Sequence, residues 1–286
     1  MEAMRQVFWN IPREIQIIFY VTTIIVVIVF VLGVLQRMSI WLEGEDEEDS
    51  VLHGLGLWGA VKLSLYTLFS TGCIFVMKLF ARGVRGVRHA FVVWGFSFKT
   101  RVFARGVRGV MHIFLVWSFV VLFIGTLITQ FNYDLHLNFL KGNFYLIFSF
   151  ALDIGGLLLL IGASVLLVRR YAAKSERMIT SAEDLIVLLL LFLIPLFGFI
   201  VEGLRLAVTQ PEAMDWSPIG ALFASLFQTV FGPRGALLRS LHLAAWLSHV
   251  SLVFILIIYI PFSKLFHMFA AQITLYATIR KYKEEL

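Results

Sequence analysis

The chain has 286 residues, of which 60% are apolar and 15% are charged, and its mean hydropathy is +0.89. A soluble domain averages about 45–50% apolar and about 25% charged residues, because the surface of a soluble folded chain must be mostly wettable. The composition therefore excludes a soluble globular protein and predicts an integral membrane protein. The single cysteine, Cys73, excludes a disulfide framework, a cysteine zinc site and an iron–sulfur cluster held by this chain alone.

Five apolar stretches are long enough to cross a bilayer as helices, which takes about 20 residues each. In chain order they are residues 15–36, 110–133, 142–168, 185–201 and 240–263, and the last continues past Lys264 toward Phe269. The third stretch contains one acidic residue, Asp153. The sequence therefore predicts an all-α, polytopic membrane protein with about five transmembrane helices.

Two further apolar stretches are shorter and have polar residues in or beside them. Residues 63–77 lie between Lys62 and Lys78, so we expect them to lie in the membrane interface. Residues 216–231 contain several polar side chains and end at Gly232 and Pro233, which is typical of an amphipathic surface helix.

The distribution of Lys and Arg predicts the orientation of the chain, because basic residues collect on the cytoplasmic side of a membrane. With five spans and the N-terminus outside, 18 of the 24 basic residues fall on the inner side and six on the outer side. We therefore expect the C-terminus to be cytoplasmic. No small-residue cleavage site follows the first apolar stretch, so we expect residues 15–36 to be a retained anchor. Anionic lipid and a docked subunit explain the basic pI of about 9.5, and no nucleic acid is expected.

The connector between the first two spans begins with an acidic run at residues 43–49, which is either a solvated loop or a docking surface for a soluble subunit. It also contains a local duplication. The sequence FARGVRGVRHAFVVWGF at residues 80–96 recurs as FARGVRGVMHIFLVWSF at residues 103–119, with 13 of 17 positions identical. Only the second copy continues into a long apolar stretch, so we expect His112 to lie in a membrane helix and His89 at the surface.

Histidines within the spans are the main candidate functional residues, because ionisable groups inside a membrane are costly and usually functional. His112 lies near the inner end of the second span. On the fifth span, His249 and His267 are 18 residues apart, which is five helical turns or about 27 Å. His242 precedes His249 by seven residues. One face of a continuous fifth helix is therefore expected to carry three imidazoles.

These positions suit a bis-histidine haem, which needs two neutral imidazoles from different helices at matching depth. His112 and His267 both fall near the inner leaflet and form the first candidate pair. His249 and His242 fall near the outer leaflet, where His136, in the loop after the second span, is a candidate partner. The alternative for each pair is a set of separate histidines that bond to neighbouring helices.

Residues 107–269 resemble the haem b membrane subunit of respiratory nitrate reductase, its gamma subunit, and related subunits of heterodisulfide reductase-like and sulfite-reduction complexes. The most specific segment is HVSLVFILIIYIPFSKLFH at residues 249–267. A similar segment of the family has two haem-ligating histidines at this spacing, with a proline, Phe-Ser and a basic residue in the same order. Four further segments are similar to the heterodisulfide reductase-related branch: residues 109–126, 134–156, 198–207 and 241–249.

The resemblance implies a protein whose membrane helices enclose b-type haem. The family carries a further ligand ten residues after the position of His112, and here that residue is Leu122, which cannot bind iron. The resemblance therefore implies one haem, held by His112 and His267 near the inner side, and leaves a second haem open. For that outer haem, His136 with His249 is the first choice, and His242 in place of one of them is the second.

Other polar residues in the spans are candidates for related roles. Glu202 and Arg205 lie one helical turn apart where the fourth span reaches the outer side, and they form either an ion pair or a quinol site in which Glu202 accepts a proton. Asp153 either orients a ligand imidazole or pairs with a neighbouring helix. Basic residues at the inner edge either bind haem propionates or reach lipid head groups; they are Lys264, Arg108 and Arg169.

The sequence thus predicts a membrane cytochrome b subunit that transfers electrons between a quinone pool and a cytoplasmic, heterodisulfide reductase-like iron–sulfur subunit of a respiratory oxidoreductase complex. We expect it in the inner membrane of a prokaryote, and without catalytic activity apart from its partner. The alternative is a haem-free anchor or transporter whose histidines line a proton or metal path. We expect one membrane domain over residues 1–286, with an anchor and connector (1–108), a haem-binding four-helix core (109–270) and a cytoplasmic tail (271–286).

Overall fold

The computed structural model describes residues 7–43, 107–172, 182–212, 214–232, 234–268 and 270. Several sequence predictions fall outside these residues: the interfacial stretch 63–77, the first copy of the duplication with His89, and nearly all of the acidic run. The basic side chain of Arg108 is also not described. The orientation of the termini stays a prediction.

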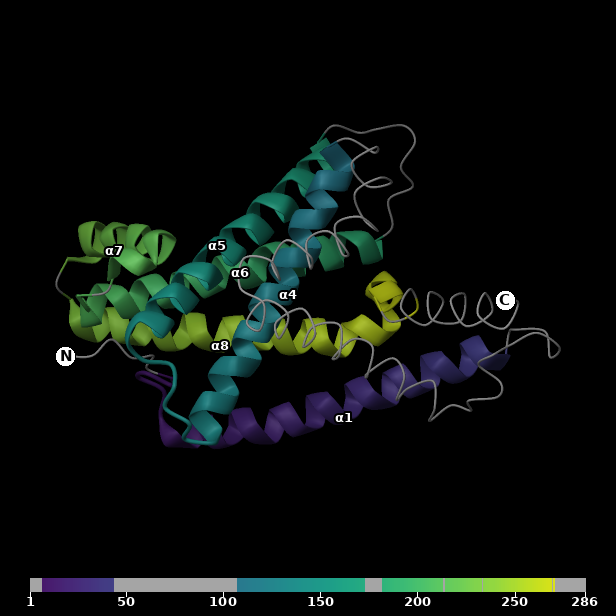
Figure 1. The fold of residues 1–286 in the computed structure, drawn as a ribbon, viewed down its shortest axis with the longest axis horizontal. Helices are drawn as coiled ribbons and strands as arrows, with labels where there is room; N and C mark the ends of the chain where they lie inside the picture. Colours follow the sequence, from purple (N-terminus) through teal and green to yellow (C-terminus); the bar gives the residue numbers. More distant parts are fainter. Residues whose placement is uncertain are drawn as a thin grey trace. The chain divides into compact units, whose positions relative to one another are not determined.

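The described part of the chain is helical and contains no β-strand. Its α-helices are α1 (Arg13–Glu43), α4 (Val107–Asp134), α5 (Gly142–Leu167), α6 (Ala182–Thr209), α7 (Pro218–Phe231) and α8 (Gly235–Tyr259). Short π or 3-10 turns lie at Val168–Ala172, Met214–Trp216, Ile260–Phe262 and Lys264–Phe266. Five helical stretches are long and apolar enough to cross a membrane, from α1, α4, α5, α6 and α8 (Figure 1). For the described residues, the predicted helical class is confirmed, as are the five helices long and apolar enough to span a membrane.

The residues group into two compact units. The first unit comprises Met1–Val21 and Val107–Ile255, and the second comprises Thr22–Gly106 and Leu256–Leu286. The first unit holds α4 to α7 and most of α8. The second holds most of α1 and the turns that follow α8. The prediction of one membrane domain with three parts is not tested by this grouping.

Glycines allow the close packing of helices in the first unit, where α5 contacts both α4 and α6 (Figure 1). A Cβ at Gly156 of α5 would lie 2.8 Å from the Phe199 ring of α6. A Cβ at Gly203 of α6 would collide with Phe223 of α7. Small residues at such contacts let membrane helices approach closely enough for van der Waals packing to hold them together.

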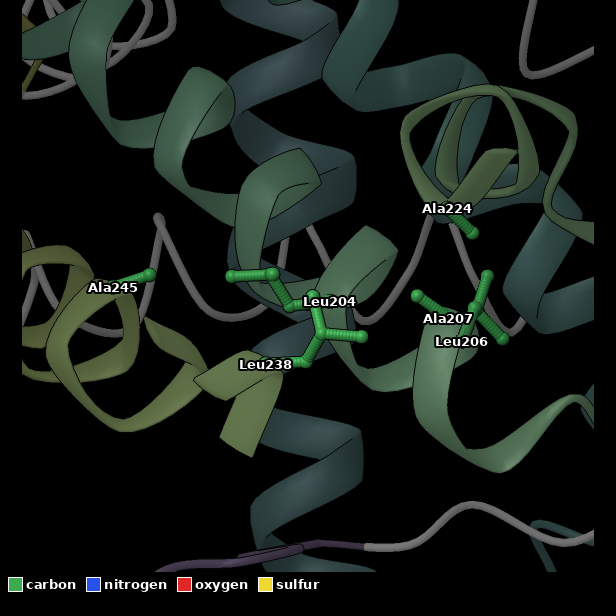
Figure 2. Packing of buried hydrophobic residues seen from close by; sticks show 6 residues of the cluster. All are labelled: Leu204, Leu206, Ala207, Ala224, Leu238 and Ala245. Atoms are coloured by element: carbon green, nitrogen blue, oxygen red, sulfur yellow. The ribbon is translucent and has the colours of Figure 1, made fainter. Parts of the chain in front are cut away.

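The core of this unit lies where α6 packs against α7 and α8 (Figure 2). Buried Leu204, from α6, lies toward Leu238 and Ala245 of α8, and Leu206 and Ala207 lie toward Ala224 of α7. Each of these six side chains is at most 7% exposed. This packing holds together the elements that carry Glu202, Arg205, His242 and His249.

α7 confirms the helix predicted within residues 216–231. Pro218 begins the helix, where its missing N–H is not needed. Gly232 ends it with a positive φ of 62° and donates its N–H to the Gln228 carbonyl oxygen, 2.8 Å away. One face of α7 is buried against α6, and the opposite face exposes Leu222 and Leu226. α7 is therefore a surface helix of this unit. Its exposed face is more apolar than the exposed face of an amphipathic helix in water.

α6 is longer than predicted, because it continues from Val201 to Thr209. The prediction ended the span at the first charged residue. In the structure Glu202 and Arg205 pair with each other within the helix, so the two charges largely compensate and the helix need not stop.

α8 is shorter than predicted, because it ends at Tyr259 and is followed by two separate 3-10 turns. Pro261 has no N–H to donate to the helix, and Ser263 has an extended backbone, with φ of −114° and ψ of 174°. The prediction of one continuous helix with His249 and His267 on one face is therefore wrong. His267 lies beyond this break.

In the second unit, α1 contacts the turns that lead to His267. A Cβ at Gly33 would lie 2.8 Å from the Phe262 ring and 2.9 Å from the Pro261 Cβ, so only glycine allows this approach without a shift. One turn along α1, the Arg37 guanidinium lies 6.0 Å from the centre of the Phe266 ring, a cation–π contact. α1 thus braces the segment immediately before His267.

Candidate functional site

His249 lies on α8 with its ring against α6. Its Nδ1 is 3.0 Å from the carbonyl oxygen of Ile194. A carbonyl oxygen can only accept a hydrogen bond, so Nδ1 is the donor, and the neutral ring keeps a free lone pair on Nε2. Gly198, one turn after Ile194, lies beside this ring, and a Cβ there would make an ordinary contact with the His249 Cε1 at 3.4 Å. This is the arrangement of a metal-ligating histidine, whose other ring nitrogen bonds to a backbone carbonyl.

His267 shows the same arrangement in the second unit. Its Nδ1 lies 2.6 Å from the carbonyl oxygen of Lys264, so Nδ1 again carries the hydrogen and is the donor. The ring is exposed. Ser263, whose Oγ accepts the N–H of Leu265 at 3.2 Å, begins the turn that presents Lys264 to the imidazole. The Pro-Phe-Ser-Lys sequence therefore fixes the orientation of His267.

Two of the other predicted haem ligands in the first unit, His112 and His136, are exposed. His112 lies in the first turns of α4, within a helix that is apolar enough to span. His136 lies in the turn after α4 with a positive φ of 52°, and its Nδ1 is 3.2 Å from the carbonyl oxygen of Asp134. His136 therefore also has an Nε2 that can bind a metal ion.

His242 differs from these histidines. It is only 2% exposed, and its Nδ1 has no hydrogen-bond partner among the described residues. The indole ring of Trp9 meets it edge-on, with 4.7 Å between the ring centres. Its tautomer is therefore not fixed by a backbone carbonyl, which favours the first choice for the outer haem, His136 with His249, over the choice that uses His242.

Glu202 and Arg205 form an ion pair on α6. The Arg205 Nη2 donates to Glu202 Oε1 at 2.6 Å, and the Arg205 Nε donates to Oε2 at 3.3 Å. The Glu202 side chain is 20% exposed and the Arg205 side chain is 11% exposed. Tyr145 of α5, itself buried, also interacts with the guanidinium. On the other side, Gly220 of α7 lies so close that a Cβ there would be 2.9 Å from the Glu202 Cγ.

Asp153 binds α7, and among the residues that the structure describes it bonds to no histidine. Its Oδ2 accepts the N–H of Ile219 at 2.7 Å and its Oδ1 accepts the N–H of Gly220 at 3.3 Å. A second contact between the same helices joins the hydroxyls of Ser149 and Ser217 at 2.7 Å. Of the two predicted roles, the structure shows the pairing with a neighbouring helix. The carboxylate satisfies backbone donors at the start of α7, where a negative charge is also favoured.

Among the described residues, no three His, Cys, Asp or Glu side chains gather as a metal-ion site. Axial ligation of haem needs only two imidazoles, so the candidate histidines do not have to gather in this way. Sequence reasoning missed Trp9, Tyr145 and the pair Ser149–Ser217. All three act through contacts with residues far away in the sequence, and no local pattern marks them.

Comparisons with known proteins agree with these features. The family model of the nitrate reductase gamma subunit matches residues 100–283. A curated relative, the EtfAB:quinone oxidoreductase of Syntrophomonas wolfei subsp. wolfei, is 31% identical over 280 residues, which are 94% of this chain. The chain spans about a third (34%) of the length of that relative. No solved structure matches the chain. With five apolar helices and the match over residues 100–283, the chain belongs to the nitrate reductase gamma subunit family of membrane cytochromes b.

Proposed function

We propose that this chain is the haem b subunit of a membrane oxidoreductase complex and exchanges electrons with a quinone pool and with a cytoplasmic iron–sulfur partner. The family supports haem and electron transfer, because it is a haem-binding cytochrome b family. The name of the curated relative, an EtfAB:quinone oxidoreductase, supports the quinone. The single cysteine supports the partner, because a cluster needs several cysteines that this chain lacks.

The observation that carries the proposal is the state of His249 and His267. Each donates Nδ1–H to a backbone carbonyl oxygen, and this bond holds the ring in one orientation and leaves Nε2 as the nitrogen without a hydrogen, which is the form that binds haem iron. Haem b, when bound, supplies a one-electron carrier inside the membrane. From the predicted depth of the residues, His112 and His267 hold the inner haem. His249 holds an outer haem with His136, or with His242 as the second choice.

Glu202 and Arg205 are the proposed quinone site. The guanidinium donates to a quinone oxygen, and this competes with its bonds to Glu202. A Glu202 oxygen released in this way accepts the proton of one quinol hydroxyl. The proton of the other hydroxyl leaves to water, and the two electrons leave one at a time through the electron carriers of the complex. Arg205 stays positively charged throughout. The pair is neutral before the reaction, and the net positive charge that it carries once Glu202 is protonated favours release of that proton.

The proposed partner is a heterodisulfide reductase-like iron–sulfur subunit, and the proposed location is the inner membrane of a prokaryote. The 18-to-6 excess of basic residues gives the cytoplasmic side a positive surface on which such a subunit docks. The chain conducts electrons and does not catalyse a reaction without this partner.

Optical spectra of purified membranes test the haem part. We expect a reduced-minus-oxidised b-type spectrum that loses amplitude in His112→Ala and in His267→Ala. His89→Ala is a matched control, because His89 lies in the first copy of the same duplicated sequence. If the wild-type chain is present in the membrane but gives no haem spectrum, the result would favour the alternative function, a haem-free anchor or transporter with a histidine-lined path.

Quinol-driven reduction of the haem in the complete complex tests the quinone part. We expect Glu202→Gln to slow this reduction while the amount of haem stays the same, because the amide cannot take the quinol proton. An unchanged rate in Glu202→Gln would mean that the ion pair serves only to stabilise α6.

A further inference from the structure

His242 has an unsatisfied ring nitrogen in the interior of the first unit. The residue is 2% exposed, and its buried Nδ1 has no hydrogen-bond partner among the described residues. Leaving such a nitrogen unpaired costs about 1–3 kcal/mol, and a buried polar atom without a partner in a native protein calls for an explanation. A ligand that hydrogen-bonds this nitrogen would remove the cost.

The surroundings of His242 are polar and charged. Arg205 and Glu202, from α6, are the charged groups within electrostatic reach of the imidazole. Tyr145 of α5 interacts with the same guanidinium, and Trp9 covers the imidazole from the N-terminal segment. Tyr145 of α5 and His242 of α8 therefore both interact with the Glu202–Arg205 pair of α6, where we proposed that a quinone binds.

The ring is also a poor candidate for binding iron. His249 and His267 both have Nδ1 bonded to a carbonyl oxygen, which places the ring hydrogen on Nδ1 and fixes the tautomer. His242 has no such bond, so its hydrogen can sit on either nitrogen. A histidine whose proton can move between its nitrogens suits a ligand that is sometimes a hydrogen-bond acceptor and sometimes a donor.

We propose that His242 binds the head group of the quinone through Nδ1, opposite the oxygen that Glu202 and Arg205 bind. This rests on the proposed quinone site. With hydrogen on Nδ1, the imidazole donates to the carbonyl of an oxidised quinone. With hydrogen on Nε2, the bare Nδ1 accepts from the hydroxyl of a quinol. One side chain thus recognises both redox states, and a quinone is the ligand class whose opposed oxygens change from acceptor to donor on reduction.

Binding of a fluorescent hydroxyquinoline N-oxide, used as a quinol analogue, tests the proposal in membranes that hold the complete complex. Losing one hydrogen bond of about 1.4 kcal/mol weakens binding about tenfold. We expect His242→Leu to show this weakening, together with a similar rise in the quinol concentration that gives half-maximal haem reduction. His242→Gln keeps a side chain that can donate and accept, so we expect it to recover most of the affinity.

Haem content separates His242 from the ligands. We expect iron per chain to stay at the wild-type value in His242→Leu and His242→Gln and to fall in His249→Ala. Ser118→Ala is a matched control, since Ser118 is also 2% exposed with an unpartnered hydroxyl, but on α4. It should leave analogue binding unchanged.

Three results would overturn the inference. A loss of iron in both His242 variants would make His242 a haem ligand. Wild-type analogue binding in both His242 variants, with weakened binding in Glu202→Gln, would leave the quinone site standing without His242. Wild-type binding in the His242 variants and in Glu202→Gln would remove the quinone site itself.

Discussion

The two hydrogen bonds between the Asp153 carboxylate and the start of α7 offer a sharp test of how the first unit is held together. α7 is only 14 residues long, and its N-terminal amides at Ile219 and Gly220 bind the Asp153 carboxylate. At Gly220, the same helix packs closely against the Glu202 side chain. Replacing Asp153 with Ala removes both acceptors and leaves two amide donors without partners.

The magnitude follows from the two bonds. A hydrogen bond to a charged group contributes about 1.5–3 kcal/mol. The bond to Ile219, at 2.7 Å, is short, whereas the bond to Gly220, at 3.3 Å, is long and counts for less. Removing the carboxylate also removes the cost of burying its charge. We therefore expect Asp153→Ala to weaken the attachment of α7 by about 2 kcal/mol, or about 30-fold in its opening equilibrium.

Amide hydrogen exchange in lipid nanodiscs measures this opening. We expect peptides from α7 to exchange about 30-fold faster in Asp153→Ala, while peptides from α4 serve as an internal reference. Asp153→Asn keeps one acceptor oxygen, so we expect its exchange rate in α7 to lie between the rates of the wild type and Asp153→Ala. Ser149→Ala removes only a neutral hydroxyl contact on the same face, and its effect should be smaller, about 1 kcal/mol. Equal exchange of α7 in wild type and Asp153→Ala would refute this reasoning.

Substitutions at Gly203 and at Gly198 test the packing of the other elements of the site. Gly203→Ala places a Cβ against Phe223, so we expect it to lower the free energy of unfolding by about 1–3 kcal/mol, measured by thermal unfolding. Gly235→Ala is the control, because a Cβ there meets nothing within 4 Å and should have little effect. Equal stabilities of the two variants would contradict the packing. At Gly198, alanine makes an ordinary contact with the His249 ring, whereas leucine must push the ring away. We therefore expect Gly198→Leu to change the haem spectrum and Gly198→Ala to keep it, and identical spectra would contradict the position of His249.

Hydropathy predicted the spans well, because each helix must satisfy its own backbone hydrogen bonds in lipid and so has to be long and apolar. It failed where charge or backbone geometry overrode composition. The fourth span was ended too early, since a sequence scan does not see that Glu202 and Arg205 neutralise each other. The fifth was extended too far, since Pro261 and Ser263 break a helix within an apolar run.

The candidate site was predicted only in part, because its decisive contacts are long-range. The histidine positions could be taken from spacing and resemblance. The bond from His249 to Ile194 joins residues 55 positions apart, and the bond from Asp153 to Ile219 joins residues 66 apart. Neither partner is marked by a local motif. The contact of Trp9 with His242 likewise depends on how the N-terminal segment returns to α8.

The most direct test of haem binding is the amount of haem b per chain in the purified complex, measured for wild type, His267→Ala and His249→Ala. We expect a b-type spectrum in the wild type, loss of the inner haem in His267→Ala, and loss of the outer haem in His249→Ala, with the other haem kept in each variant. Wild-type haem content in both variants, in chains that still assemble in the membrane, would contradict the assignment of His249 and His267 as the ligands.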